Sequence, residues 1–173
     1  MSQYTPTSGT ILQIEWQSTD PDQMGCSLNV TFQSMDQGLI HMIVDGTTYV
    51  MNSCPLRAGD QVTFFYLTDA PVPLIYPPQY RASAAVHTPS GTYAALDVFT
   101  QSAYNGQLTN SDDTLQLNLS NNTAMMLANG QPFGGTLSGK LLLVIYSATT
   151  RSIPAQTTPE KIVVFCSNES AGS

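Results

Sequence analysis

The sequence predicts an all-β protein with two tandem OB-like or Greek-key units, each a small barrel or sandwich. Three observations predict this class. Short runs of alternating apolar and polar residues, or of β-branched and aromatic residues, recur along the 173 residues. Turn signals such as Asp-Gly and Asn-Gly lie between these runs. Finally, 11 prolines interrupt most windows in which a helix would form.

The first unit is expected over residues 9–87, with the five strands of a small Greek-key barrel. Ser27–Gln33 shows the strand pattern most clearly, because its apolar and polar residues alternate and give it one buried face. The third strand is expected to bend at Asp45-Gly46, and the turn over 56–60 is typical of OB-like barrels. The expected strands are Gly9–Trp16, Ser27–Gln33, Leu39–Met51, Gln61–Leu67 and Tyr80–His87.

The second unit is expected over 88–167. It supplies only four strands of its own if 114–119 and 123–127 form one bent strand. We therefore expect either that the strand near 80–87 serves both units, or that the second unit lacks a strand and leaves an open edge for another chain. The expected segments are Tyr93–Thr100, Thr114–Leu119, Thr123–Leu127, Lys140–Tyr146 and Lys161–Cys166.

Short tails are expected at both ends of the chain, over 1–8 and 168–173. The first tail is polar and carries no charged side chain. We expect it to be flexible, as termini commonly are, and the alternative is that it supplies a strand to a neighbouring subunit. It has neither the basic nor the apolar segment of a secretory signal, so synthesis in the cytoplasm is expected.

The two halves of the chain resemble each other. Each contains a strand that ends near a tyrosine, then a polar turn, a Pro-containing loop and a further strand. The alignment places Pro73 on Pro154 and Pro78 on Pro159 at one constant spacing, and it places Thr47 on Thr123. An internal duplication is the simplest explanation of this pattern.

The Pro-rich segments Ala70–Arg81 and Thr149–Glu160, with their flanking strands, resemble a family of duplicated OB-like β-barrel proteins from spore-forming Gram-positive bacteria. The resemblance extends from Gly9 to Cys166. It implies a bacterial and sporulating source, and a final place on a spore or cell surface. It implies no activity and carries over no catalytic or cofactor-binding residue.

The composition excludes several classes of partner. Only 10% of the residues are charged, and 5 Lys+Arg stand against 12 Asp+Glu, for a net charge of −7. A chain with so few basic residues offers no electrostatic surface for nucleic acid or for anionic lipid. Its longest apolar run, Leu141–Tyr146, is far shorter than the roughly 20 residues of a membrane-spanning helix.

The three cysteines, Cys26, Cys54 and Cys166, are candidate disulfide or assembly residues. None belongs to a CxxC pair, and with two histidines the chain has no zinc-binding spacing. One hypothesis is that all three are buried thiols. The other is one internal disulfide with an odd cysteine left for an intermolecular bond, for which Cys166, near the end of the chain, is the best candidate.

Tyr76 and Tyr80 are the candidate contacts to a partner. They flank the Pro77-Pro78 pair, where the prolines are expected to set a rigid loop and the tyrosines to pack against the barrel. Alternatively, the two aromatic rings stack on sugar rings, since OB-like barrels bind oligosaccharides across one face. The segment 134–140 nearly matches a phosphate-binding loop, but Leu141 replaces the hydroxyl residue and a strand follows, so a Gly-rich hairpin is favoured.

No catalytic, metal-binding or cofactor-binding site is predicted. His41 and His87 are both expected on strands, and the sequence shows neither a nucleophile elbow nor a Cys-His pairing. The acidic pairs lie in turns, where aspartate bonds to its own backbone, and they are too sparse for calcium. We therefore expect that the protein is not an enzyme.

These observations predict a non-catalytic structural protein that assembles into homo-oligomers or homopolymers, such as filaments. Pairing of strand edges and intermolecular disulfides would join the copies, and the low charge reduces the repulsion between them. The alternative is a binding module for a glycan or a protein partner. It would use a barrel face together with the Pro-rich loop at Tyr76 and Tyr80.

Overall fold

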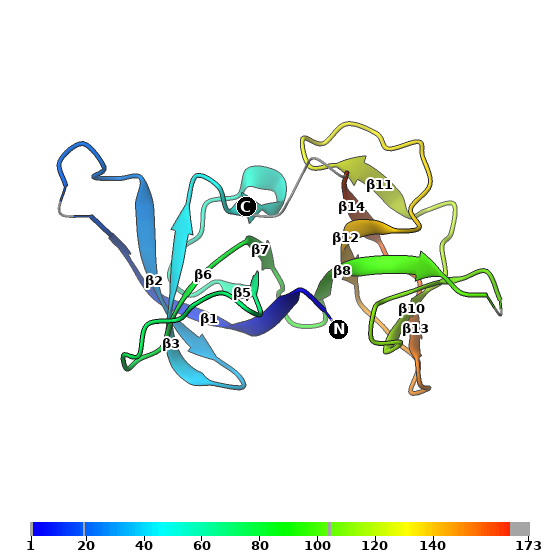
Figure 1. Cartoon of the computed structure of the whole chain (residues 1–173), viewed down its shortest axis with the longest axis horizontal. Coiled ribbons are helices and arrows are strands. Elements are labelled where there is room, and N and C mark those ends of the chain that lie inside the picture. The colour runs from blue at the N-terminus through cyan, green and yellow to red at the C-terminus, as the bar shows by residue number, and fades with distance from the viewer. Residues whose placement is uncertain (1, 19, 104, 167–173) are drawn as a thin grey trace. The chain divides into compact units, whose positions relative to one another are not determined.

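The computed structural model describes residues 2–18, 20–103 and 105–166. It confirms the all-β class, with 48% strand, 2% helix and two seven-stranded sheets, one in each half of the chain (Figure 1). Residues 5–90 and 91–166 fall into two compact units. As a class the structure is a β-solenoid rather than two barrels, so the prediction is confirmed only for the all-β class and the two units.

The first sheet has the strand order β4-β7-β5-β1-β2-β3-β6. A single 3-10 turn, η1 (Met51–Ser53), follows β4. No helix in the described part of the chain is long and apolar enough to cross a membrane. The strands are β1 (Tyr4–Trp16), β2 (Ser27–Ser34), β3 (Gly38–Asp45), β4 (Tyr49–Val50), β5 (Gln61–Leu67), β6 (Gln79–Arg81) and β7 (Ala84–His87).

The second sheet repeats this arrangement strand for strand, with the order β11-β14-β12-β8-β9-β10-β13. In both sheets the third and sixth strands of the unit pair in parallel, and so do the fourth and seventh. The common order supports the predicted internal repeat. The strands are β8 (Tyr93–Gln101), β9 (Leu108–Thr109), β10 (Leu115–Leu117), β11 (Ala124–Leu127), β12 (Lys140–Tyr146), β13 (Ala155–Thr157) and β14 (Lys161–Phe165).

The structure corrects the alignment of the halves. The Thr48 hydroxyl donates a hydrogen bond to the Ala82 carbonyl at 2.8 Å. The Thr123 hydroxyl donates in the same way to the Pro159 carbonyl, also at 2.8 Å. Thr123 therefore corresponds to Thr48 rather than to Thr47. By the same bond Pro159 corresponds to Ala82, so the proline spacing used for the sequence alignment does not match equivalent positions.

The predicted sharing of a strand near 80–87 is wrong. In the described chain, β6 and β7 pair within the first sheet, and the second sheet has seven strands of its own. The strands that the sequence analysis missed are β9 and β13, which have two and three residues. Segments so short show no alternation, so they are defined by their pairing, β9 with β8 and β10, and β13 with β10.

The prediction of a flexible N-terminal tail is also wrong for residues 4–8, because β1 begins at Tyr4. The buried Thr7 hydroxyl forms a hydrogen bond with Ser34 Oγ at 2.7 Å. Ser8 bonds to Thr63 Oγ1 on β5 at 2.7 Å. These residues therefore belong to the sheet of their own chain. The predicted tail at 168–173 lies outside the described residues.

Each unit has a core of its own. In the first, Phe32 and Phe64 meet edge to face with ring centroids 4.9 Å apart. The first core consists of Ile11, Val30, Phe32, Ile40, Met42, Val44, Val62, Phe64, Ala82 and Ala85. The second consists of Phe99, Leu108, Leu115, Leu117, Leu137, Leu142, Val144, Ile162 and Val164.

Gly9 lets β1 and β2 approach closely. It pairs with Ser34 across the two strands. A Cβ at this position would lie 1.9 Å from the Gln33 carbonyl oxygen, which is inside any tolerable contact. Every side chain is therefore excluded here by the backbone of the neighbouring strand.

Candidate functional site

The connection between β5 and β6 exposes a group of apolar side chains. We call residues 70–78 the apolar loop. Leu74 is fully exposed, Tyr76 is 86% exposed, and Ile75 is also exposed. Four prolines lie within the loop, and no charged residue occurs between Asp69 and Arg81. Proline restricts the backbone, so the loop loses less conformational freedom on binding than a Gly-rich loop would.

The two candidate tyrosines of this region lie in different environments. Tyr80, on β6, stacks on Tyr66 with ring centroids 4.2 Å apart and packs against the first core. Its hydroxyl donates to Gln37 Oε1 at 2.6 Å, and Gln37 Nε2 donates to the Tyr66 hydroxyl at 3.2 Å. Tyr76 projects into solvent instead. The predicted packing against the sheet thus holds for Tyr80 and is wrong for Tyr76.

The equivalent loop of the second unit, between β12 and β13, is polar. Its one large exposed apolar side chain is Ile153, at 94%. Hydroxyl groups brace the loop: Thr150 Oγ1 bonds with Ser152 Oγ at 2.6 Å and accepts from the Gln156 amide at 3.0 Å. The two units therefore carry the same connection with different surface chemistry.

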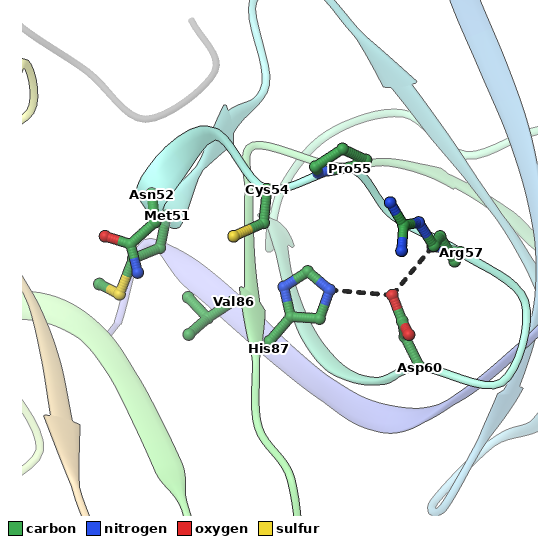
Figure 2. Close-up of a pocket in the computed structure, with 8 residues that line it drawn as sticks. All are labelled: Met51, Asn52, Cys54, Pro55, Arg57, Asp60, Val86 and His87. Atoms are coloured by element: carbon green, nitrogen blue, oxygen red, sulfur yellow. Dashed lines mark hydrogen bonds and ion pairs between the residues drawn. The ribbon is translucent and has the colours of Figure 1, made fainter.

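A separate pocket of about 420 Å³ lies entirely within the first unit, between η1, the turn before β5 and the end of β7 (Figure 2). This volume falls in the range of small-molecule sites. The lining residues are Met51, Asn52, Cys54, Pro55, Arg57, Asp60, Val86 and His87.

Asp60 fixes the orientation of His87 in this pocket. His87 Nε2 and Asp60 Oδ2 are 2.9 Å apart, and the same oxygen accepts the Arg57 amide at 2.9 Å. The hydrogen bond with His87 is the largest influence on the Asp60 carboxyl and lowers its pKa below the ordinary value of 3.8. Asp60 is therefore an ionised acceptor near neutral pH.

Cys54 lies on the other side of the imidazole. Figure 2 shows its sulfur on the side of the His87 ring that faces away from Asp60, and it draws no hydrogen bond between the two side chains. The thiol is free and exposed. Asn52 and Ser53, just before it, both have positive φ angles, 62° and 51°. Two consecutive non-glycine residues in this region are uncommon and strained, so the packing around them must hold this backbone.

The sequence analysis missed this combination of Cys54, Asp60 and His87. The residues come from three segments, and the antiparallel pairing of β5 with β7 brings the last two together, with Val62 opposite His87. No local sequence motif predicts the register of β5 against β7. The usable signal was the strand that follows the 56–60 turn, once its pairing with β7 is known.

The other cysteines are not among the residues that line this pocket. Cys26 is an exposed free thiol in the connection from β1 to β2. Cys166 is half-buried and packs against the second core. No disulfide joins the three cysteines, which all lie in the described ranges. The buried-thiol hypothesis is therefore wrong for Cys26 and Cys54, and a disulfide, whether internal or intermolecular, stays a prediction.

The remaining sequence motifs take the places expected for structural elements. His41 lies on β3, where its Nδ1 is 3.0 Å from Asn29 Oδ1, and His87 lies on β7. The segment 134–140 ends in a turn with Gly139 at a φ of 84° and leads directly into the strand β12. In the described ranges, no three or more His, Cys, Asp or Glu side chains are placed so that together they could hold a metal ion.

No family model, curated protein or solved structure matches this chain.

Proposed function

We propose that the protein is a non-catalytic structural protein that associates with copies of itself through the apolar loop. The observation that carries this proposal is the set of exposed side chains at Leu74, Ile75 and Tyr76 on a Pro-rich, charge-free segment. Contiguous exposed apolar surface marks interaction sites. Full burial of such a side chain contributes about 1.5–3 kcal/mol, so three of them supply a useful share of a binding energy.

The chemistry of the loop favours a protein surface over a glycan as its occupant. Residues 70–78 are Ala, Pro, Val, Leu, Ile and Tyr, so their side chains offer a single polar group, the Tyr76 hydroxyl. A sugar presents many hydroxyls that need hydrogen-bonding partners, and an apolar surface leaves them unpaired. A protein partner needs only complementary apolar surface.

A second copy is the partner we favour, because only 10% of the residues are charged and copies repel one another weakly. Cys26 and Cys54, as exposed thiols, can add intermolecular disulfides. Pairing of strand edges receives less support. The edge strands of the first sheet, β4 and β6, have two and three residues, and residues 4–8 are already used in β1.

Each unit is proposed to be OB-like in its strand pairing. The support is that β3 pairs in parallel with β6 while β4, the next strand after β3, pairs in parallel with β7, the next strand after β6. In the sheet order, β5 lies between β7 and β1, so each strand of the unit has a neighbour that continues the sheet. In OB-like folds the loop corresponding to the apolar loop is a binding element.

The second candidate function is a binding module for a different protein or a glycan. The observation that favours it is a further exposed group on the β1–β2 connection, the other loop with which OB-like folds bind ligands. Trp16 at the end of β1 and Met24 in the connection are both exposed. A bacterial, sporulating source and a place on a spore or cell surface belong to the proposal as well.

Sedimentation velocity with a reductant present tests self-association without disulfides. We expect the chain to form oligomers or polymers as concentration rises, visible by negative-stain microscopy. The double change Leu74→Ser with Tyr76→Ser should weaken association at least tenfold. Ile153→Ser, in the equivalent loop of the second unit, is the matched control and should change little.

A chain that remains monomeric at high concentration would contradict self-association, and so would a double variant that associates as strongly as the parent chain. A carbohydrate array with hits that disappear in Tyr76→Ala would support the second candidate instead.

A further inference from the structure

We propose that Cys54, His87 and Asp60 form a thiol-exchange site, in which Cys54 forms a mixed disulfide with a small disulfide that carries carboxylate groups. The inference is independent of self-association through the apolar loop. It rests on the presence of Cys54, Asp60 and His87 in one pocket, with Arg57 in the same lining. It also rests on the second unit, where the positions equivalent to Asp60 and His87 hold other residues.

The hydrogen bond between Asp60 and His87 determines which nitrogen of the imidazole is basic. An ionised carboxylate only accepts hydrogen bonds, so His87 Nε2 carries the hydrogen that Asp60 Oδ2 accepts at 2.9 Å. In the neutral ring Nδ1 is then the unprotonated nitrogen. Figure 2 shows that this nitrogen lies on the side of Cys54. A nucleophile, a base and a group that orients the base therefore line the same pocket.

The pocket gives a small disulfide access to the thiol. Cys54 is exposed at the pocket, whose volume is about 420 Å³. The Arg57 side chain lines the same pocket. A guanidinium binds a carboxylate through two parallel hydrogen bonds, so Arg57 favours an anionic reactant over a neutral one. The charged or titratable groups lining the pocket are Cys54, Arg57, Asp60 and His87.

The second unit shows that the fold does not require Asp60. The Gly59 amide donates to the Ile11 carbonyl at 2.7 Å, and the Gly139 amide donates to the Phe99 carbonyl at 2.8 Å. Both glycines have positive φ angles; Gly59 lies two residues before the first residue of β5, and Gly139 lies one residue before the first residue of β12. The position after the turn is Asp60 in the first unit and Lys140 in the second.

His87 is equally dispensable for the fold. It pairs with Val62, which is the third residue after Gly59. The equivalent pair in the second unit is Leu142 with Val164. An apolar residue therefore fills the His87 position in the other copy of the same sheet. Since neither Asp60 nor His87 is needed for the sheet, their presence together beside a thiol calls for a chemical role.

The exchange balances without any further reactant. His87 Nδ1 takes the Cys54 proton, and the thiolate attacks one sulfur of the small disulfide. A sulfur–sulfur bond forms to Cys54 as the original sulfur–sulfur bond breaks, and the second half leaves as a thiolate that recovers the proton from His87 or water. The Cys54 sulfur is oxidised and the leaving sulfur is reduced, and the thiolate is the reacting species.

The test follows mixed-disulfide formation with 5,5′-dithiobis(2-nitrobenzoate), a disulfide with two carboxylates. The fully reduced, dilute chain is mixed with the probe and quenched at intervals with acid, and peptide mapping by mass spectrometry gives the extent of reaction at each cysteine. Cys26, an exposed thiol in the same molecule, is the internal control. We expect Cys54 to react at least tenfold faster than Cys26 near neutral pH.

His87→Gln should lower the Cys54 rate at least tenfold and leave a pH profile like that of Cys26, while Asp60→Asn should cause a smaller loss. Arg57→Gln should slow the reaction with this probe but not with the neutral 4,4′-dithiodipyridine. Equal rates at Cys54 and Cys26 in the unchanged chain overturn the proposal, whatever the stability of the variants. A His87→Gln variant with an unchanged Cys54 pH profile overturns it too.

Discussion

Thr48 and Thr123 occupy the same place in the two halves of the chain. Each is a buried threonine whose hydroxyl donates to a backbone carbonyl oxygen 2.8 Å away. The two accepting carbonyls, of Ala82 and Pro159, lie just before the last strand of their units. Each hydroxyl also accepts the amide of the residue three positions earlier, at 3.2 and 3.3 Å. One side chain thus connects a turn to a strand that lies far away in the sequence.

Thr48→Val should destabilise the first unit by about 1–3 kcal/mol, because it leaves the buried Ala82 carbonyl and the Asp45 amide without their partner. The measurement is the free energy of unfolding in urea. Thr47→Val is the matched control, since Thr47 is exposed and bonds only to Asp45. A larger loss at Thr47 than at Thr48 would contradict the corrected alignment of the halves.

Gly9→Ala should destabilise the chain by about 2 kcal/mol or more, because the new methyl group would meet the Gln33 carbonyl oxygen at 1.9 Å and force β1 away from β2. Thermal unfolding measures the effect. Gly134→Ala is the control, since no atom lies within 4 Å of a Cβ there. If both variants unfold alike, the close approach of the two strands is not as described.

Stability should depend on the Asp60 carboxyl at acid pH. Because the pKa of Asp60 is lowered in the folded chain, the ionised carboxylate stabilises the fold at pH values above its ordinary pKa of 3.8. This contribution is lost as the pH falls through the lower folded value. The difference in unfolding free energy between the parent chain and Asp60→Asn should therefore shrink below about pH 3.8.

Substitutions of Tyr76 and Tyr80 should have different effects, the first on self-association and the second on the stability of the fold. Tyr80→Ala removes a ring stacked on Tyr66 and a hydroxyl bound to Gln37, so it should cost about 2 kcal/mol of unfolding free energy. Tyr76→Ala removes an exposed side chain and should leave the unfolding free energy within about 0.5 kcal/mol. The same preparations, compared by sedimentation, should lose association only in Tyr76→Ala. A destabilised Tyr76→Ala would show that this ring packs on the fold.

The sequence predicts much of the strand content for a physical reason. A strand with one buried face must alternate, and β2 does so with Val30 and Phe32 buried. The Gly59 turn and its counterpart at Gly139 were also visible, because positive φ angles favour glycine. Features that depend on local backbone preference or on burial of one face can be found in one sequence.

The missed features depend on distant pairing. The two residues of β9 are a strand only because β8 and β10 lie on either side. Tyr4–Ser8 lacks an alternating pattern, and it is Ser34 and Thr63 that fix Thr7 and Ser8. The pocket at Cys54 requires the register of β5 against β7. No local preference in the chain encodes these long-range registers.

If copies assemble as proposed, the different loops of the two similar units would give the assembly a direction. If the apolar loop of one copy meets a different surface on the next, each contact joins unlike surfaces, and no twofold axis relates the two copies. Contacts of this kind form closed rings only when the rotation between copies happens to return to its start, and otherwise they build an open fibre. A fibre built in this way would have two chemically distinct ends, one displaying an unused Leu74 and Tyr76, and would grow at them at different rates.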